Sequence, residues 1–279
     1  MIRSLLLLGA VAATVAACAG PGPGPTMTVA AAADPENALL AHVYAAGLRY
    51  YGTTARVENS DDPLEALDTG TAGVAAGLTG RLLQRFDPGS AARSAEGVYR
   101  AMIGALPEGI AAGDYAPAAE DKPALAVTES TAQKWASRDL TAVVDRCAQV
   151  SVGTATGTMP PDAVGECALA PAREFGTEAM VFDALLAGTV TAVWTTTAST
   201  AVPDGVVVLV DRKPTLIPAE NVVALYRRNE LDQMQLRAIN EIAGVLDTAA
   251  LTAMLREVRG GADPESVAQQ WLEQNPLGR

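Results

Sequence analysis

The stretch that most constrains the fold is residues 183–228, in which apolar and polar segments alternate in a set order. Residues 184–187 can end a helix, and Gly188 supplies the left-handed backbone that commonly terminates one. A short apolar strand is expected at 190–194, and a polar loop, a second strand, a proline-containing segment and a third strand follow it. Helices that alternate with strands in this way predict an α/β fold.

The expected strand at 190–194 turns polar where it ends, at Thr195, Thr196 and Thr197. In open α/β sheets, ligands bind outside the carboxyl ends of the strands. The hydroxyl-rich continuation therefore predicts one wall of a ligand site. A solvated loop is the alternative that spacing alone leaves open.

Two pairs of similar segments suggest that the fold has two comparable halves. Residues 66–74 resemble 184–192, and residues 124–129 resemble 223–228. Similarities this short also arise by chance, because Ala, Gly and Thr are common in the chain. Together they favour two α/β lobes joined by crossing strands, an architecture that creates a cleft.

Composition narrows the classes of function. The 279 residues suffice for one or two domains, and a hydrophobic fraction of 49% supports a substantial core. The net charge of -12, without a basic patch, argues against a nucleic-acid partner. The single histidine, His42, falls in a predicted helix, and P-loop, HExxH, CxxC and GxGxxG motifs are absent. We therefore expect that the protein binds no cofactor, has no metal site and is not an enzyme.

The amino-terminal residues predict export and membrane anchoring. Residues 1–17 have a charged start at Arg3 and an apolar run too short to remain as a membrane span, so they are expected to be a signal peptide. Residues 15–18, Val-Ala-Ala-Cys, resemble the bacterial lipobox, which implies cleavage before Cys18 and lipidation of its sulfur. An ordinary secretory signal is the alternative. Residues 18–26, rich in Gly and Pro, are expected to be a lipidated tether.

The two remaining cysteines, Cys147 and Cys167, form an even pair in an expected exported domain. Such a pair favours a disulfide, which would contribute about 3 kcal/mol through loop closure. Two unpaired buried thiols are the alternative.

Helix caps and apolar periodicity predict most other elements. Asp34-Pro35-Glu36 and Asp263-Pro264-Glu265 each indicate a helix start, because aspartate caps, proline fits the first turn and glutamate complements the helix dipole. The expected strands are 27–32, 124–127 and 150–154; the expected helices are 35–51, 61–70, 90–105, 135–147, 231–246, 248–259 and 264–274; and 106–123 and 159–171 are expected to be loops.

With these elements placed, the chain resembles the substrate-binding protein of glycine betaine/choline-type osmoprotectant ABC importers, over nearly all of residues 27–277. The stretches that carry the resemblance, by their order and spacing, are Ala184-Leu185 with Gly188, the strand at 124–127, residues 211–223 with Arg227, and residues 263–272. The resemblance implies an α/β, two-lobed type II periplasmic-binding-protein fold with a ligand cleft between the lobes. It also implies delivery of a small solute to an ABC permease in the membrane.

On this basis lobe 1 is expected to comprise residues 27–122 together with 215–279, and lobe 2 residues 123–214. The protein is expected to be a monomer in the bacterial cell envelope, anchored in the lipid bilayer through acylated Cys18 on the extracytoplasmic face.

Several departures from the family concern its aromatic cage. Aromatic faces attract quaternary ammonium groups, yet aromatic residues make up only 4% of this chain. Leu78, Pro123 and Thr196 stand where the family commonly has aromatic residues, and so does Ala219 or Glu220. The cage is therefore expected to be largely dismantled, which favours a polar, hydrogen-bonding ligand.

The expected ligand-binding residues lie at the first helix start, at strand ends or in the segment that returns to the first lobe before its last strand: Asp34, Glu36, Asn37, Leu78, Thr79, Trp194, Thr195, Thr196, Glu220 and Asn221. An envelope binding protein that kept the fold but lost transport is the alternative function. An envelope hydrolase is disfavoured, because the chain has no Gly-x-Ser-x-Gly elbow and its one histidine makes a poor general base inside a helix.

Overall fold

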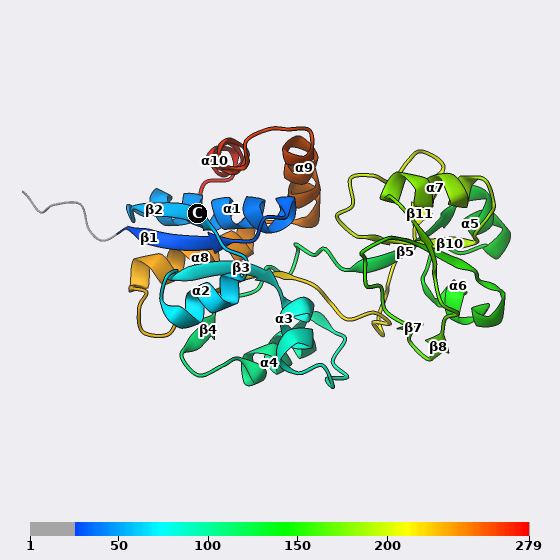
Figure 1. Ribbon diagram of the computed structural model, residues 1–279, viewed down its shortest axis with the longest axis horizontal. Coiled ribbons are helices and arrows are strands. Elements are labelled where there is room, and N and C mark those ends of the chain that lie inside the picture. Colours follow the sequence, from blue (N-terminus) through cyan, green and yellow to red (C-terminus); the bar gives the residue numbers. More distant parts are fainter. Residues whose placement is uncertain (1–25, 279) are drawn as a thin grey trace, which may run out of the picture.

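The computed structural model describes residues 26–278, which form two α/β lobes (Figure 1). Each lobe is built on one five-stranded mixed sheet. In the first sheet the strand order is β2 (Ala55–Asn59), β1 (Met27–Ala31), β3 (Val74–Leu78), β12 (Val222–Arg227) and β4 (Ile110–Ala112). In the second it is β11 (Val206–Val208), β5 (Pro123–Thr128), β10 (Ala192–Thr196), β6 (Val152–Ala155) and β9 (Arg173–Phe175).

The helices divide between the lobes in the same way (Figure 1). The first lobe holds α1 (Pro35–Tyr50), α2 (Pro63–Thr69), α3 (Thr79–Phe86), α4 (Ala95–Ala105), α8 (Gln233–Val245), α9 (Thr248–Arg259) and α10 (Pro264–Gln274). The second holds α5 (Glu129–Trp135), α6 (Thr141–Val144) and α7 (Glu178–Leu186), with a small hairpin of β7 (Ala163–Val164) and β8 (Cys167–Ala168). The expected α/β class and two-lobed architecture are confirmed.

The register of the first sheet brings three chain segments to one edge. β1 runs parallel to β3, so the carboxyl ends of both strands lie at the same edge, where α1 and α3 begin. β12 is antiparallel to β3, and its first residue, Val222, pairs with Leu78 at the end of β3. Residues 219–221 therefore enter the lobe beside the starts of both helices.

The second sheet meets the other end of the crossing. β10 is antiparallel to β5, and Thr196 at the end of β10 pairs with Pro123 at the start of β5. The segment that arrives from the first lobe through Lys122 therefore runs beside the polar end of β10. Figure 1 shows this green segment and the yellow return segment before β12 passing between the lobes.

The helix caps are those that the sequence predicts. The amide of Asn37 donates to the Asp34 side chain, and the amide of Ser266 donates to Asp263. Asp62 caps α2 in the same way, and Gly70 ends that helix with a φ of 78°. Because aspartate satisfies otherwise unpaired amides in the first turn, each cap fixes a helix start.

Each lobe has its own apolar core. In the first lobe α1 is the central helix, and Leu39, Leu40 and Tyr44 are fully buried between the sheet and helices α8 to α10. In the second lobe Leu125 and Trp194 pack in one core cluster on β5 and β10. Burial of side chains of this size contributes roughly 1.5–3 kcal/mol each, which is what holds each sheet to its helices.

Three expectations for individual elements are wrong at their boundaries or altogether. The helix predicted over 135–147 is not continuous, because α5 begins earlier, at a cap made by Thr128, and ends at Trp135. Only the short α6 and the start of a 3-10 turn at Cys147 are helical in that range. The helix predicted over 90–105 begins at Ala95, because Ser94 is its cap. β4, β9 and the β7–β8 hairpin lie in or beside segments expected to be loops, since two- and three-residue strands leave little periodicity to detect.

Cys147 and Cys167 form a disulfide with their Cα atoms 5.6 Å apart, which confirms the expected pairing. It ties a short 3-10 turn to β8 in the second lobe. The expected signal peptide, Cys18 and the expected tether up to residue 25 lie outside the described residues. Within residues 26–278, no single helix is long and apolar enough to cross a membrane, although α8 and α9 together, bent by 98°, meet the criteria of length and composition.

Candidate ligand site

Two segments pass between the lobes: residues 119–122, the first crossing, and residues 219–221, the second crossing. Backbone hydrogen bonds join them. The amide of Asp121 donates to the carbonyl of Glu220 over 3.0 Å, and the amide of Val222 donates to the carbonyl of Ala119 over 3.1 Å. The pairing places the side chains of residues 119–122 and 219–221 at the edge where β1, β3 and β12 meet. A site that both lobes share is therefore expected at the crossing.

Asp121 connects the two lobes through one side chain. It is only 4% exposed, and its Oδ1 accepts a hydrogen bond of 2.9 Å from the amide of Ala198, just beyond β10. Its Oδ2 lies 4.0 Å from Nη2 of Arg81 on α3. Because a buried carboxylate needs donors or a counter-charge, these contacts hold the end of β10 against the start of α3.

Glu36, in the first turn of α1, faces the same cluster. Its Oε2 accepts a hydrogen bond of 3.0 Å from Nη1 of Arg81, while its Oε1 is buried without a hydrogen-bond partner among the described residues. Burial, and then the charge of Asp121, raise the pKa of Glu36 to about 8, although Arg81 opposes the shift. At neutral pH this carboxyl group is therefore mostly protonated.

Glu220 supports Arg81 from the second crossing. Its Oε2 accepts a hydrogen bond of 2.8 Å from the amide of Arg81, in the first turn of α3. Burial raises the pKa of Glu220 to about 7, against the lowering effect of that amide and of the Arg81 charge. A Cβ atom on Gly80 would lie 2.6 Å from the carbonyl oxygen of Ala219 and 2.8 Å from Cδ of Glu220, so only glycine allows this approach.

Thr79 and Asn221 are both buried and are joined to each other. The Thr79 hydroxyl accepts a hydrogen bond of 3.0 Å from the amide of Asn221, and the Asn221 side chain donates to the carbonyl of Ala116 over 3.0 Å. Leu78, also buried, pairs in the sheet with Val222. These expected ligand residues hold the crossing against the first lobe.

The other expected residues on α1 also have local partners. Asn37 accepts a hydrogen bond from the amide of Ala32 over 2.6 Å and donates to the carbonyl of Ala76 over 3.1 Å. Asp34 is exposed and caps α1. Of the first-lobe residues that the sequence points to, Glu36 and Glu220 are those whose carboxyl groups lie at Arg81.

On the second lobe, the three residues expected on β10 lie in different surroundings. Trp194 is 6% exposed and packs in the lobe core. Thr195 is buried, and its hydroxyl donates to Glu178 over 3.3 Å, whereas Thr196 is half-buried at the end of the strand. The next residue, Thr197, bonds the crossing, because its hydroxyl donates to the carbonyl of Glu120 over 3.1 Å.

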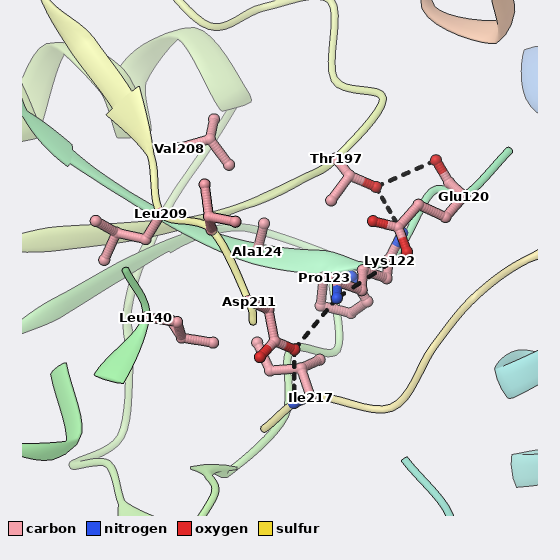
Figure 2. Close-up of a pocket in the computed structure, with 11 residues that line it drawn as sticks. Glu120, Lys122, Pro123, Ala124, Leu140, Thr197, Val208, Leu209, Asp211 and Ile217 are labelled. Carbon is pink, nitrogen blue, oxygen red and sulfur yellow. Dashed lines mark hydrogen bonds and ion pairs between the residues drawn. The ribbon is translucent and has the colours of Figure 1, made fainter. Parts of the chain in front are cut away.

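A pocket of about 200 Å³ lies where the first crossing enters the second lobe (Figure 2). Lys122 pairs there with Asp211 over 3.2 Å, and its Nζ is 4.0 Å from a carboxylate oxygen of Glu120. Asp211 also accepts hydrogen bonds from the amides of Leu216 and Ile217. Since each polar group in this pair has partners, the pocket is best explained as part of the connection between the lobes.

Arg81 and Asp121 are the site residues that sequence reasoning missed. Arg81 stands two residues after Thr79, at the start of a helix that was not predicted. Asp121 lies in a segment expected to be a loop. The available signal in the sequence was an aspartate beside a lysine just before an apolar strand. Within residues 26–278, no group of three or more His, Cys, Asp or Glu residues is arranged to hold a metal ion.

Comparison with known proteins supports this description of the fold. Residues 171–274 match the family model described as the substrate binding domain of the ABC-type glycine betaine transport system. No curated protein sequence matches the chain.

Three solved structures illustrate the similarity. A glycine betaine/carnitine/choline ABC transporter structure superposes with a TM-score of 0.73 at 16% identity, covering 89% of this chain and 98% of that chain. Apo YehZ from Escherichia coli gives a TM-score of 0.69 at 18% identity, covering 90% and 99%. A choline-binding protein of an ABC transporter, in complex with choline, gives 0.56 at 14% identity, covering 90% and 89%.

At these identities the solved structures establish the fold, and the family model adds the match over residues 171–274. The chain thus has the type II periplasmic-binding-protein fold, and its resemblance to the substrate-binding proteins of glycine betaine/choline-type ABC importers is confirmed.

Proposed function

We propose that the chain is the solute-binding component of an ABC importer for a small polar solute, either of the osmoprotectant or quaternary-amine class or a divergent ligand. The observation that carries the proposal is the match of residues 171–274 to a family of substrate-binding domains, on a chain with the matching fold. In this proposal residues 27–122 with 215–279 form one lobe and residues 123–214 the other.

The cluster at the crossing supports a role in lobe closure. Asp121 contacts Arg81 on the first lobe and the amide of Ala198 at the end of β10. A ligand that engages Asp121 would therefore sense both lobes, and closure would follow from tighter binding to the closed state. We assign the ligand site to Glu36, Arg81, Asp121 and Glu220, and we include Thr196, which pairs with Pro123 at the end of β10, as the residue of the second lobe.

We further propose that the protein acts as a monomer on the extracytoplasmic face of the membrane. Removal of residues 1–17 and acylation of Cys18 would anchor it, and residues 18–26 would be the tether. Mass spectrometry of the membrane-bound protein tests this part, because the acylated Cys18 peptide carries the mass of the lipid. A Cys18→Ala variant should be absent from the membrane fraction, because it lacks the acylated residue.

The solute-binding function is tested by two measurements on the mature protein with a panel of osmolytes, amino acids, amines, sugars and polyols. A true ligand raises the melting temperature, because it binds only the folded state. It also reduces the radius of gyration in small-angle X-ray scattering, because the lobes close. A full panel that changes neither quantity, with capture of an envelope protein other than a permease, contradicts transport and favours the non-transport alternative.

A further inference from the structure

The charges around Arg81 are unbalanced. Carboxyl groups from three elements converge on this one cation: Glu36 from α1, Asp121 from the first crossing and Glu220 from the second. Arg81 makes hydrogen bonds of 3.0 Å to Glu36 and, through its amide, 2.8 Å to Glu220. At 4.0 Å its Nη2 is too far from Asp121 for a hydrogen bond. Two acids, Glu36 and Asp121, therefore share one guanidinium, and a third, Glu220, lies at the backbone amide of the same residue.

An unpartnered atom marks the place that lacks a donor. Glu36 is 8% exposed, and its Oε1 is buried with no hydrogen-bond partner among residues 26–278. The Asp121 carboxylate lies on the same guanidinium as Glu36, and its charge adds to burial in raising the pKa of Glu36, because a second negative charge nearby favours the protonated form. Two carboxyl groups in this position can be satisfied either by a shared proton or by an N–H group from elsewhere.

On the premise of the proposed solute-binding function, we propose that the Glu36–Asp121 carboxyl pair recognises a small ligand cation that carries N–H groups. The cation is a primary or secondary ammonium or a guanidinium, and it replaces the proton held by the pair. The ligand approaches from the side of Arg81, whose side chain is 56% exposed and lies directly on Glu36.

The chemistry of the neighbours distinguishes this ligand from a quaternary amine. A quaternary ammonium has no N–H to donate and is held by aromatic faces. Trp194 packs in the core of its own lobe, and Leu78 and Thr196 offer no ring. Carboxylate oxygens accept charge-assisted hydrogen bonds, which are about twice as strong as neutral ones. The site therefore favours a cation with donors.

Binding exchanges one cation for another. The protonated pair releases one proton to the buffer, and the ligand ammonium takes its place, so the charge of the complex equals that of the free protein. The charged groups that face Glu36 are Asp121 from the first crossing and Arg81 from α3, with Glu220 acting on it through Arg81. Apparent affinity therefore rises with pH until the pair has lost its proton.

The experiment uses two matched pairs of probes on the mature protein: ethanolamine against choline, and glycine against glycine betaine. Within each pair only N-methylation differs. Isothermal titration calorimetry at pH 6, 7 and 8, in two buffers of different ionisation enthalpy, gives both the Kd and the number of protons released. We expect the N–H probe of at least one pair to bind at least about tenfold more tightly than its methylated partner at pH 8.

The pH series gives the second expectation. With a pKa of about 8 for Glu36, the Kd of the N–H probe should be about 50-fold weaker at pH 6 than at pH 8, with about one proton released at pH 6. Glu36→Gln should weaken binding and flatten this dependence to less than about threefold. Glu265→Gln is the matched control, because Glu265 occupies the same position in an Asp-Pro-Glu start but pairs with Arg49 far from the site.

Each outcome decides the proposal. If choline or glycine betaine binds and neither N–H probe binds more tightly than its methylated partner, or if the pH dependence is unchanged in Glu36→Gln, the proposal is overturned while the solute-binding function stays intact. Binding and closure only with solutes that carry no ammonium or guanidinium group does the same. If neither pair binds and no panel solute closes the lobes, the solute-binding function itself fails. The proton count in the wild-type protein keeps the test independent of how Glu36→Gln folds.

Discussion

The two Asp-Pro-Glu helix starts are alike in sequence and differ in what surrounds them. In both, aspartate caps the helix, with amide-to-carboxylate distances of 2.9 Å at Asp34 and 3.0 Å at Asp263. In both, the glutamate pairs with an arginine, over 3.0 Å at Glu36 and 2.8 Å at Glu265. Yet the Glu36 side chain is 10% exposed, whereas the Glu265 side chain is 49% exposed.

The difference arises from topology. α1 begins at the carboxyl end of β1, under the two crossings, so its first-turn acid meets Asp121 and Arg81. α10 packs on α1 at the surface of the lobe, so its acid stays in water. The same local motif therefore serves only as a helix start in one place and as a buried proton site in the other.

The largest expected effect is on how stability depends on pH. The unfolded Glu36 loses its proton near its ordinary pKa of 4.5, whereas the folded form keeps it to about 8. The folded state thus binds more protons, and stability falls as pH rises through this window, by up to about 1.4 kcal/mol per pH unit. The free energy of unfolding, measured with urea, should therefore fall less steeply between pH 5 and 8 in Glu36→Gln than in the wild-type protein.

Glu220 also has a raised pKa and contributes to the slope in both proteins, so the difference between the curves isolates Glu36. Glu265→Gln should follow the wild-type curve. Parallel curves for wild type and Glu36→Gln would mean that burial does not raise the pKa of Glu36, and the contrast between the two starts would be lost.

Gly80→Ala, on α3, is a second substitution that should disturb the surroundings of Glu36 and leave those of Glu265 unchanged. The new methyl group would collide with the carbonyl of Ala219 and with the Glu220 side chain, so that Glu220 must leave the first turn of α3. Overpacking of this kind costs about 1–3 kcal/mol. Gly244→Ala, on α8, where nothing lies within 4 Å, is the control and should be neutral or slightly stabilising. Equal effects in chemical denaturation would contradict the crowded geometry.

The caps should behave alike, which sharpens the contrast between the acids. Asp34→Ala and Asp263→Ala each remove one cap, and each should lower Tm by about 2–4 °C in a chain of this size. Differential scanning calorimetry at pH 7 measures both. If one cap proves several times more important than the other, the two starts are not locally equivalent.

The smallest effect is expected for Glu265→Gln. The Arg49–Glu265 pair is partly exposed, and exposed pairs contribute little because water and salt screen them. The change in Tm should be below about 2 °C and should shrink further in about 0.5 M salt. A larger loss would show that the outer acid has a structural role of its own.

How far the sequence can predict this molecule is clear from the same two motifs. Asp34 and Asp263 indicated the starts of α1 and α10, because capping is a local interaction that the sequence contains in full. The disulfide followed from the two cysteines, Cys147 and Cys167, that remain once the expected lipidation site at Cys18 is set aside. Burial of Glu36 could not be predicted in this way, since it depends on Arg81, 45 residues away, and on Asp121 in the crossing.

Elsewhere in the chain the same limit applies. The predicted strand ended two residues before β10 does, because Thr195 and Thr196 are polar, although both belong to the strand. Trp194, expected at the site, packs in the core, since pleating alone decides which side of a strand faces inward. Contacts between the crossings join residues about one hundred positions apart, which no local pattern records.

Burial and the charge of Asp121 hold Glu36 protonated at the crossing between the lobes. The most direct test is a carbon-13 NMR titration of the Glu36 side-chain carboxyl, assigned by comparison with Glu36→Gln. We expect a pKa of about 8 in the free protein and a lower pKa once an N–H cation such as ethanolamine is bound. A Glu36 that titrates near its ordinary value of 4.5 and does not respond to the ligand would contradict it.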